Sequence, residues 1–317
     1  MCTAVVFQSK DRYFGRNLDL ERGYGEQVVI TPRGFLFEHG SFRLEPNHHA
    51  MIGMAAVLDG FPLYYEATNE MGLSMAGLNF PGNAYYGEAV QEKDNIPPYA
   101  FIPWILGRCG DLEAAKQLLR NLHLVGEDFD PQLPASPLHW MISDKKGSIV
   151  VESTVEGMKV WDNPFEVLSN NPPFDYHRMH LNNFMGLGVG PTVSEFSGKY
   201  PLHNYSLGLG AMGLPGDFSS SSRFVKAFFV KENSQCREDE NSSVHQFFHI
   251  LNSVAMPRGC VWTEHGYEYT RYSSCCNVDR GIYYYTTYEE PSIKSVNLFD
   301  EDLDGEGLRE FPVTGLQ

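Results

Sequence analysis

The sequence predicts an α+β fold with layered β-sheets, and three observations support this prediction. Short runs of β-branched and small apolar residues open the chain, helical apolar stripes follow, and aromatic strand-like runs close it. The 317 residues are 42% hydrophobic and 13% aromatic, which is enough for a large buried core. Neither a fixed-period repeat nor a low-complexity linker is visible, so we predict a single domain over residues 1–317.

Strands are expected where apolar or β-branched runs are bounded by turns rich in Gly, Pro and Asp. Four such runs precede residue 81, two flank a turn at 144–147, and two aromatic runs lie near the end of the chain. In order, the predicted strands are 3–8, 27–31, 51–57, 73–80, 138–143, 148–153, 267–272 and 282–288.

Four helices are predicted from apolar residues at helical spacing. The prolines at 97–98 suit the first turn of one helix, and Pro103 is expected to kink or delay it. Asp111 is a candidate N-cap for the second helix. The third is expected to begin within the serines at 219–222, and the fourth near Ser242.

The balance of charge excludes one broad class of function. The chain carries 24 basic and 40 acidic residues, a net charge of −16. Phosphate binding relies on clustered Lys and Arg, so nucleic acid is not expected as the main partner. The longest apolar runs are too short to span a bilayer, so no membrane partner is expected either. No signal peptide is visible and the six cysteines are scattered, so we expect a cytoplasmic protein with free thiols.

Two motifs point to other chemistry but fit it poorly. Residues 208–213 match the dinucleotide pattern G-x-G-x-x-G, but Pro215 interrupts the helix that this pattern requires, so a turn-rich loop is favoured. His245 and His249 lie four residues apart on a predicted helix, as metal ligands can. No Glu follows His245, and a structural or surface role is favoured. We therefore expect no metal, nucleotide or other cofactor.

Cys2 is the residue whose position suggests catalysis. The initiator Met is normally removed when a small residue follows it, which would leave Cys2 with both a thiol and a free α-amine. These groups have ordinary pKa values of about 8.5 and about 8, so one residue can supply nucleophile and general base near neutral pH. A neighbouring strand in a hairpin would place Arg16 and Asp19 beside this terminus, where a guanidinium favours the thiolate and a carboxylate holds the ammonium.

Several motifs, in the same order along the chain, resemble the choloylglycine hydrolase family. Its members include conjugated bile salt hydrolases and penicillin V acylases, within the N-terminal-nucleophile hydrolases. The resemblance covers essentially the whole chain, including its later segments at 272–275 and 281–285. The motifs are Met1-Cys2-Thr3, Gly15-Arg16-Asn17-Leu18-Asp19, Ala76-Gly77-Leu78-Asn79-Phe80-Pro81, Leu138-His139-Trp140, Ser169-Asn170-Asn171-Pro172 and Gly213-Leu214-Pro215-Gly216-Asp217 through Ser222-Arg223-Phe224.

The resemblance implies a four-layer αββα sandwich of two antiparallel sheets flanked by helices, in a mature chain that begins at Cys2. It also implies hydrolysis of an amide through a thioester at Cys2. The reaction needs preorganised N–H donors for the oxyanion, and one such donor can contribute about 3 kcal/mol. The implied site consists of the nucleophile Cys2, Arg16 and Asp19 beside its thiol and amine, Asn79 and Asn170 at oxyanion-hole positions, and Arg223 as the charged partner.

The resemblance favours glycine- or taurine-conjugated bile salts as substrates, because the family's penicillin acylases tend to carry Tyr where this chain has Asn79. A sterol requires a large apolar pocket. Segments that match the family's pocket loops contain five candidate lining residues, each equally suited to an ordinary core: Leu18, Tyr24, Phe61, Leu133 and Leu138.

Two alternatives remain open at this point. One is a penicillin V acylase or another N-acyl amide hydrolase with the same machinery. The other is a catalytically silent relative that binds an amphipathic ligand without turnover. The resemblance also suggests a homotetramer.

Overall fold

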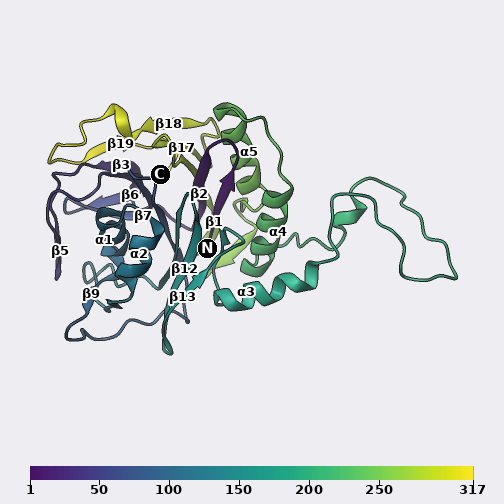
Figure 1. Cartoon of the computed structure of the whole chain (residues 1–317), viewed down its shortest axis with the longest axis horizontal. Helices are drawn as coiled ribbons and strands as arrows, with labels where there is room; N and C mark the ends of the chain where they lie inside the picture. The colour runs from purple at the N-terminus through teal and green to yellow at the C-terminus, as the bar shows by residue number, and fades with distance from the viewer. Residues whose placement is uncertain (317) are drawn as a thin grey trace.

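Two antiparallel sheets stacked face to face form the centre of the structure, a computed structural model that describes residues 1–316 (Figure 1). The first sheet consists of β1 (Cys2–Gln8), β2 (Arg12–Leu20), β14 (Val167–Leu168), β15 (Val261–Thr263), β16 (Gly266–Asn277), β17 (Ile282–Thr287) and β18 (Lys294–Asn297). The second consists of β3 (Glu26–Thr31), β6 (Met51–Leu58), β7 (Phe61–Asn69), β8 (Ser74–Asn79), β11 (Leu138–Asp144), β12 (Gly147–Thr154), β13 (Gly157–Asp162) and β19 (Arg309–Pro312). Two short pairs lie outside them: β4 (Phe37–His39) with β5 (Phe42–Leu44), and β9 (Asp94–Ile96) with β10 (Leu122–Leu124).

The first sheet combines strands from the beginning, the middle and the later part of the chain. It runs β14-β1-β2-β16-β17-β18, so β1 pairs with β14 and β2, and β2 pairs with β16. The second sheet runs β13-β12-β11-β8-β7-β6-β3-β19. Because β2 lies between β1 and β16, residues of all three strands are available to a site at the first residues of β1.

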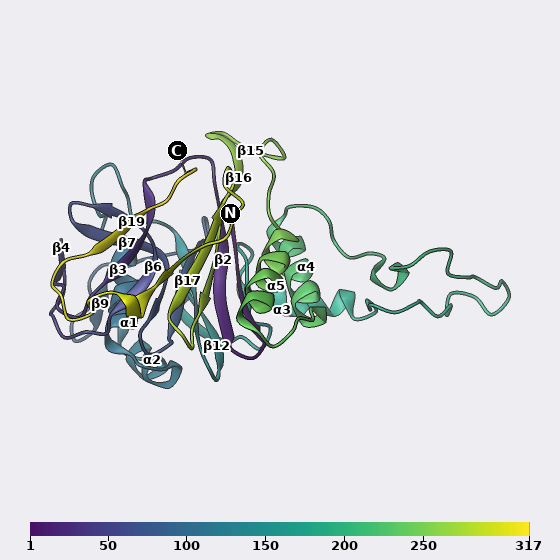
Figure 2. The same cartoon turned by 90° about the horizontal axis from the view of Figure 1, so that it is seen from above.

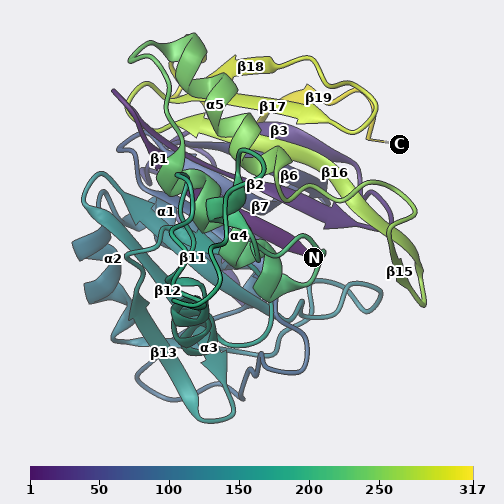
Figure 3. The same cartoon turned by 90° about the vertical axis from the view of Figure 1, so that its right-hand side faces the viewer.

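Helices cover the outer face of each sheet, which gives four layers (Figure 2). The helices are α1 (Phe101–Arg108), α2 (Leu112–Leu119), α3 (Phe174–His180), α4 (Ser220–Asn233) and α5 (Glu240–Asn252). Helices α1 and α2 pack on β7, β8 and β11, whereas α4 and α5 pack on β1, β2, β14 and β16 (Figure 3). None of the helices in residues 1–316 has both the length and the apolarity required to cross a membrane.

The predicted strands and helices are all present, with shifted ends. A 3-10 turn at Pro98–Ala100 delays the start of α1 to Phe101, so Pro103 lies in the first turn of this helix. Backbone N–H groups of the first turn have no acceptor within the helix, so proline, which lacks this group, is tolerated there. Asp111 caps α2 by accepting from the Ala114 amide at 2.8 Å, as predicted. Helix α5 begins before Ser242, and β16 extends well past the predicted 267–272.

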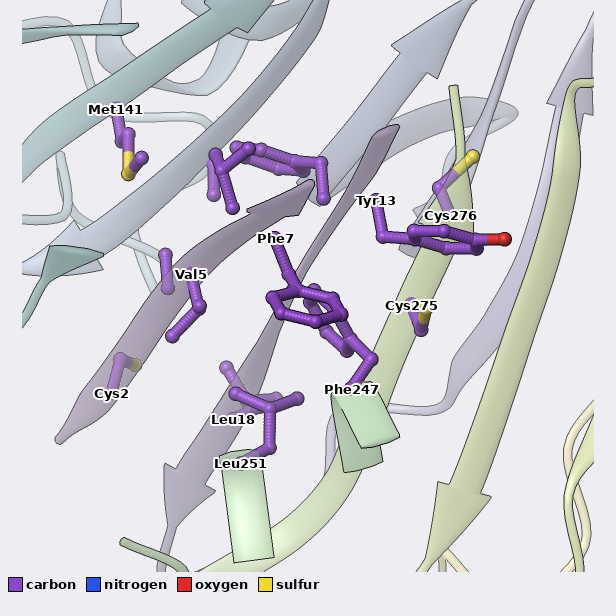
Figure 4. Packing of buried hydrophobic residues seen from close by; sticks show 14 of the residues in the cluster. Cys2, Val5, Phe7, Tyr13, Leu18, Met141, Phe247, Leu251, Cys275 and Cys276 are labelled. Atoms are coloured by element: carbon purple, nitrogen blue, oxygen red, sulfur yellow. The ribbon is translucent and has the colours of Figure 1, made fainter. Parts of the chain in front are cut away.

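Two hydrophobic cores hold the layers together. One joins the facing sides of the two sheets and continues beneath α4 and α5, and Figure 4 shows Cys2, Leu18 and Leu251 among its members. The other lies between the second sheet and α1 and α2, around Trp104 and Trp140. The start of β1 is thus fixed by packing on both of its faces.

A long arm, residues 185–216, projects from the body between α3 and α4 (Figure 1, Figure 2). Its two limbs are tied by hydrogen bonds from Gly188 N to Gly210 O at 2.8 Å and from Asn204 Nδ2 to Thr192 O at 2.8 Å. Its large exposed apolar side chains are Met185, Val189, Val193, Phe196, Tyr200, Leu202, Tyr205, Leu207 and Met212.

Candidate active site

The β1–β2 hairpin places Arg16 and Asp19 beside Cys2. Cys2 pairs with Leu18, and Ala4 pairs with Arg16. Paired residues project to the same face and successive residues alternate, so Cys2 and Arg16 share the face that meets the second sheet. Asp19 projects to the opposite face, toward the layer of α4 and α5.

Met1 covers the candidate nucleophile in this chain. Its α-amino group donates to Asp19 O at 2.8 Å and forms an ion pair with Glu268, and its carbonyl oxygen accepts from Asp19 N at 3.0 Å. Burial lowers the pKa of this amino group below its ordinary value. The side chain of Cys2 is buried, and its backbone nitrogen is an amide that donates to Asn170 Oδ1 at 2.7 Å. Removal of Met1 would convert that nitrogen into an α-amine at the same place.

Asn170 is fixed through all of its polar groups. Its Oδ1 accepts from Cys2 N and from Arg223 Nη2, both at 2.7 Å. Its Nδ2 donates to the backbone oxygen of Asn79 at 2.7 Å, which leaves the second amide hydrogen unassigned. Its backbone N–H donates to Ser220 Oγ at 2.8 Å, and its backbone oxygen lies 2.9 Å from His177 Nε2. The neighbouring Asn171 instead donates to Pro81 O.

Arg223 joins the first turn of α4 to the start of β1. Its Nη1 donates to the backbone oxygen of Cys2, and to Thr3 Oγ1 at 2.6 Å. Its Nε donates to Phe218 O at 3.0 Å, and its guanidinium lies 3.9 Å from Asp19 Oδ2. Full burial lowers the pKa of this guanidinium, although Asp19 and Cys2 oppose the effect.

Arg16 and Asp19 are both fully buried and present opposite charges to the two sides of Cys2. Arg16 crosses to the second sheet, where Nη1 donates to Gly77 O at 2.5 Å and to Tyr65 O at 3.1 Å. Burial alone would lower the pKa of Arg16, but attraction to Cys2, Tyr272 and Glu66 raises it. Asp19 Oδ1 accepts from Thr270 Oγ1 at 2.6 Å, whereas Oδ2 has no hydrogen-bond partner within residues 1–316.

A cavity of about 340 Å³ opens beside Met1 and the two candidate oxyanion residues. Its lining residues are Met1, Leu20, Glu21, Asn79, Pro81, Asn170, Asn171, Ser220 and Glu268. Asn79 lies at the end of β8, opposite Leu138. The structure therefore brings all six predicted catalytic residues together around one position.

The five predicted substrate-binding residues do not line that cavity, as far as residues 1–316 show. Leu18 packs next to Cys2, and Leu138 pairs with Asn79. Phe61 lies in an aromatic cluster, with its ring 5.9 Å from that of Phe129, whose amide donates to Leu133 O. Tyr24 is 40% exposed on the turn between β2 and β3.

A larger cavity, about 1080 Å³, lies between α5 and β16–β17 and contains none of the six catalytic candidates. His245 and His249 line it, and His245 Nδ1 contacts Asn241 O at 2.7 Å. Across the described residues, no group of three His, Cys, Asp or Glu side chains is placed to hold a metal ion. The glycines at 208–213 form a turn within the arm, and α4 begins only at Ser220.

Two buried residues that the sequence analysis did not select hold the segment before Asn170. His139 Nε2 lies 2.7 Å from Ser169 O, and its Nδ1 lies 3.2 Å from Glu152 Oε1. Glu152 also accepts from Phe174 N at 2.9 Å and from Trp161 Nε1 at 3.2 Å. Both ring nitrogens of His139 thus face oxygen atoms, so the ring links Glu152 to the backbone directly before Asn170. The motif Leu138-His139-Trp140 was the feature of the sequence that could have drawn attention to His139.

The full chain matches known proteins. Residues 2–311 match the family model described as linear amide C–N hydrolases, choloylglycine hydrolase family. The bile salt hydrolase/transferase of Lactiplantibacillus plantarum is 48% identical over 99% of this chain and 97% of that protein. The bile salt hydrolase/transferase of Clostridium perfringens is 39% identical over 98% and 96%.

Solved structures agree in fold. The C2A mutant of the conjugated bile acid hydrolase from Clostridium perfringens superposes with a TM-score of 0.92 at 36% identity, over 99% of this chain and 98% of that one. Penicillin V acylase from Agrobacterium tumefaciens shares the fold, with a TM-score of 0.79 at 19% identity over 100% and 93%. These matches confirm the predicted αββα sandwich. The chain belongs to the choloylglycine hydrolase family of linear amide C–N hydrolases.

Proposed function

We propose that this enzyme hydrolyses the amide bond of glycine- or taurine-conjugated bile salts, with Cys2 as its nucleophile after removal of Met1. One observation carries the mechanism: the backbone nitrogen of Cys2 already lies 2.7 Å from Asn170 Oδ1, which Arg223 also contacts. Two relatives at 48% and 39% identity carry the name bile salt hydrolase/transferase, which supports the substrate.

The reaction begins with transfer of the thiol proton of Cys2 to its own α-amine. The thiolate attacks the amide carbon, and the oxyanion accepts hydrogen bonds from the amide groups of Asn79 and Asn170. The α-ammonium gives its proton to the leaving nitrogen as the C–N bond breaks, which leaves a thioester. The same amine then takes a proton from water, which attacks the thioester and releases the free bile acid.

The surrounding charges suit these steps. Arg16 stabilises the thiolate, and Asp19 Oδ2, which accepts no hydrogen bond within residues 1–316, is available to the α-ammonium. The mechanism uses no metal, nucleotide or other cofactor. The acyl group is proposed to lie against Leu18, Tyr24, Phe61, Leu133 and Leu138. Because these residues do not line the present cavity, the cavity would have to widen toward them when substrate binds.

A transfer reaction is a second candidate, favoured by the word transferase in the names of these two relatives. A primary amine would replace water: its nitrogen forms a bond to the thioester carbon, the C–S bond breaks, and the α-amine of Cys2 takes the released proton. Incubation with a conjugated bile salt and a second amino acid would yield the new conjugate, whereas release of free bile acid alone would contradict this candidate.

Assembly and location also remain proposals. We propose a homotetramer in the cytoplasm built from a single domain per chain. The arm supports self-association, since it exposes nine large apolar side chains and carries only Glu195 and Lys199 as charged residues in a chain of net charge −16.

The direct test compares amine release from glycocholate, taurocholate and penicillin V by protein whose intact mass shows loss of Met1. Cys2→Ala is expected to lower turnover by a factor of at least about 10³, because the nucleophile is lost. Cys260→Ala, which removes an exposed thiol elsewhere, is the matched control and should retain full activity. Full activity of Cys2→Ala would refute the mechanism, and a clear preference for penicillin V would replace the proposed substrate. Binding of bile salts without turnover would favour the silent relative.

A further inference from the structure

Glu66 is a fully buried carboxylate in the gap between the two sheets, and the proposed mechanism does not use it. It lies on β7, opposite Met54 of β6 and Ala76 of β8, so its side chain is directed toward the first sheet. A buried carboxylate is costly unless hydrogen bonds or a cation compensate it. Its partners therefore indicate what keeps it there.

Three groups of the first sheet converge on this carboxylate. Tyr272 donates its hydroxyl to Oε2 at 2.7 Å, and Tyr283 donates to Oε1 at 2.5 Å. The Nε of Arg16 lies 3.8 Å from Oε2. Each carboxylate oxygen thus receives one phenol proton, and Arg16 is the cation beside it.

Arg16 connects Glu66 to Cys2. The register places Arg16 diagonally across from Cys2 on the same face of the β1–β2 hairpin, a separation that a long side chain spans. Its Nη1 is held by two backbone oxygens, Tyr65 O at 3.1 Å and Gly77 O at 2.5 Å. The guanidinium therefore has an anionic group at Glu66 and a second at the thiolate of Cys2.

We propose that Glu66 is a positioning residue that acts through Arg16 to set the charge balance at the Cys2 thiol, an inference that rests on the proposed nucleophile. With the thiolate formed and Met1 removed, the buried cations are Arg16, Arg223 and the α-ammonium. The buried anions are Asp19, Glu66, the thiolate itself and Glu268, which pairs with the N-terminal amino group. Without Glu66, Arg16 loses the carboxylate beside it, and the thiolate is then the anion that its guanidinium attracts.

Other titratable groups face the two ends of this network. Arg16 and Asp19 from β2, Arg223 from α4 and Glu268 from β16 face Cys2 and its N-terminal side. Tyr272 and Cys276 from β16 and Tyr283 from β17 face Glu66, next to Tyr65 on its own strand. Burial raises the pKa values of Tyr272, Tyr283 and Cys276, so these groups stay neutral near pH 7. Burial also raises the pKa of Glu66, and Arg16 and the hydrogen bonds from the two phenols oppose this effect.

The experiment measures the thiol pKa of Cys2 without any substrate. Protein with Met1 removed is alkylated with iodoacetamide from pH 4 to 9, and modification of the N-terminal peptide is followed by mass spectrometry. Glu66→Gln should lower the thiol pKa by about 0.5 to 1 unit, because loss of a nearby negative charge favours the thiolate. The acid limb of kcat/KM for glycocholate should move to lower pH by the same amount.

Glu26→Gln is the matched control. Glu26 is a buried carboxylate whose Oε1 lies 3.9 Å from Nε of the buried Arg271, so the same chemical change disrupts a similar pair that does not contact Arg16. This variant should leave the thiol pKa unchanged even if it loses stability. Glu66→Asp keeps the charge and withdraws it by one methylene, so its shift should be intermediate.

An unchanged thiol pKa in folded Glu66→Gln, or an equal shift in Glu26→Gln, would overturn the inference. If Glu66→Gln does not fold, Glu66→Asp decides: a lowered thiol pKa supports the proposal and a wild-type value refutes it. The alkylation readout separates this failure from that of the proposed function, since a protein with the expected thiol shift and no amide hydrolysis would refute the proposed function alone.

Discussion

Asn170 depends on a histidine that the structure holds in the neutral form. His177 Nε2 donates to Asn170 O at 2.9 Å, while its buried Nδ1 has no hydrogen-bond partner within residues 1–316. Its ring stacks on Phe224, with centroids 4.7 Å apart. A proton on Nδ1 would therefore be a buried charge without an acceptor, and burial lowers the pKa of His177 from 6.5 to about 4.

This histidine makes folding stability depend on pH. Between pH 6.5 and about 4 the unfolded chain binds a proton at His177 that the folded chain does not, so stability falls as the pH is lowered through this window. The loss should reach about 3 kcal/mol near pH 4. Urea unfolding of His177→Gln, which keeps a side-chain N–H donor, should show a weaker pH dependence by that amount. His265→Gln changes an exposed histidine and should behave as wild type; an identical slope in both variants would contradict the argument.

At the residue scale, the sequence allowed the catalytic candidates to be predicted but not their supports. Cys2 was conspicuous from its position, and Arg16 and Arg223 from motifs, and the structure brings these three residues together. Glu66, Glu152 and Ser220 gave no such signal, because a polar residue inside a strand or at a helix start usually faces water. The burial of Glu66 and Glu152 results from the stacking of layers, which the local sequence does not encode.

At the element scale, close approach between β2 and β16 fixes the candidate site. Gly15 of β2 lies so near to β16 that an added Cβ would be 2.0 Å from Ser274 O and 2.9 Å from the Cα of Cys275. Both obstacles are backbone atoms of a central strand, which cannot move without breaking the sheet. Only glycine fits at this position.

Gly15→Ala should therefore separate β2 from β16 and displace Arg16 and Asp19 together. We expect a loss of about 3 kcal/mol or more in the free energy of unfolding, with a large loss of turnover. Gly216→Ala is the control, since a Cβ there meets no atom within 4 Å and the backbone is not in the left-handed region. Chemical denaturation of both variants checks this, and equal stabilities would show that β16 can yield.

Hydrophobic patterns in the sequence predicted one strand too short and missed another. The predicted strand at 267–272 is the first half of β16, which continues to Asn277. Its second half, Ser273 to Asn277, is buried on both faces between a sheet and a helix layer, so the expected alternation of polar and apolar residues is absent. Strand β7 was not predicted, because Pro62 and Glu66 interrupt its apolar pattern.

At the scale of the whole molecule, the arm is the surface most suited to self-association. Replacement of Phe196, Tyr205 and Leu207 by Ser should reduce the molecular mass in solution to that of a smaller assembly, because these exposed side chains would no longer be buried between copies. Size-exclusion chromatography with light scattering measures this. Val155→Ser, at an 80% exposed apolar position on the body, should leave the mass unchanged. A monomeric wild-type protein would contradict the proposal.

In the sequence, the arm also separates catalytic candidates that lie close together in the structure. Cys2, Asn79 and Asn170 precede it, and Arg223 follows it. The first sheet is divided in the same way, with β1, β2 and β14 on one side and β16 to β18 on the other. A break at Gly198, beyond the paired limbs, would yield two pieces that each hold part of one sheet and neither a complete site. Amide hydrolysis would then require the two polypeptides to associate, so its rate would measure their association.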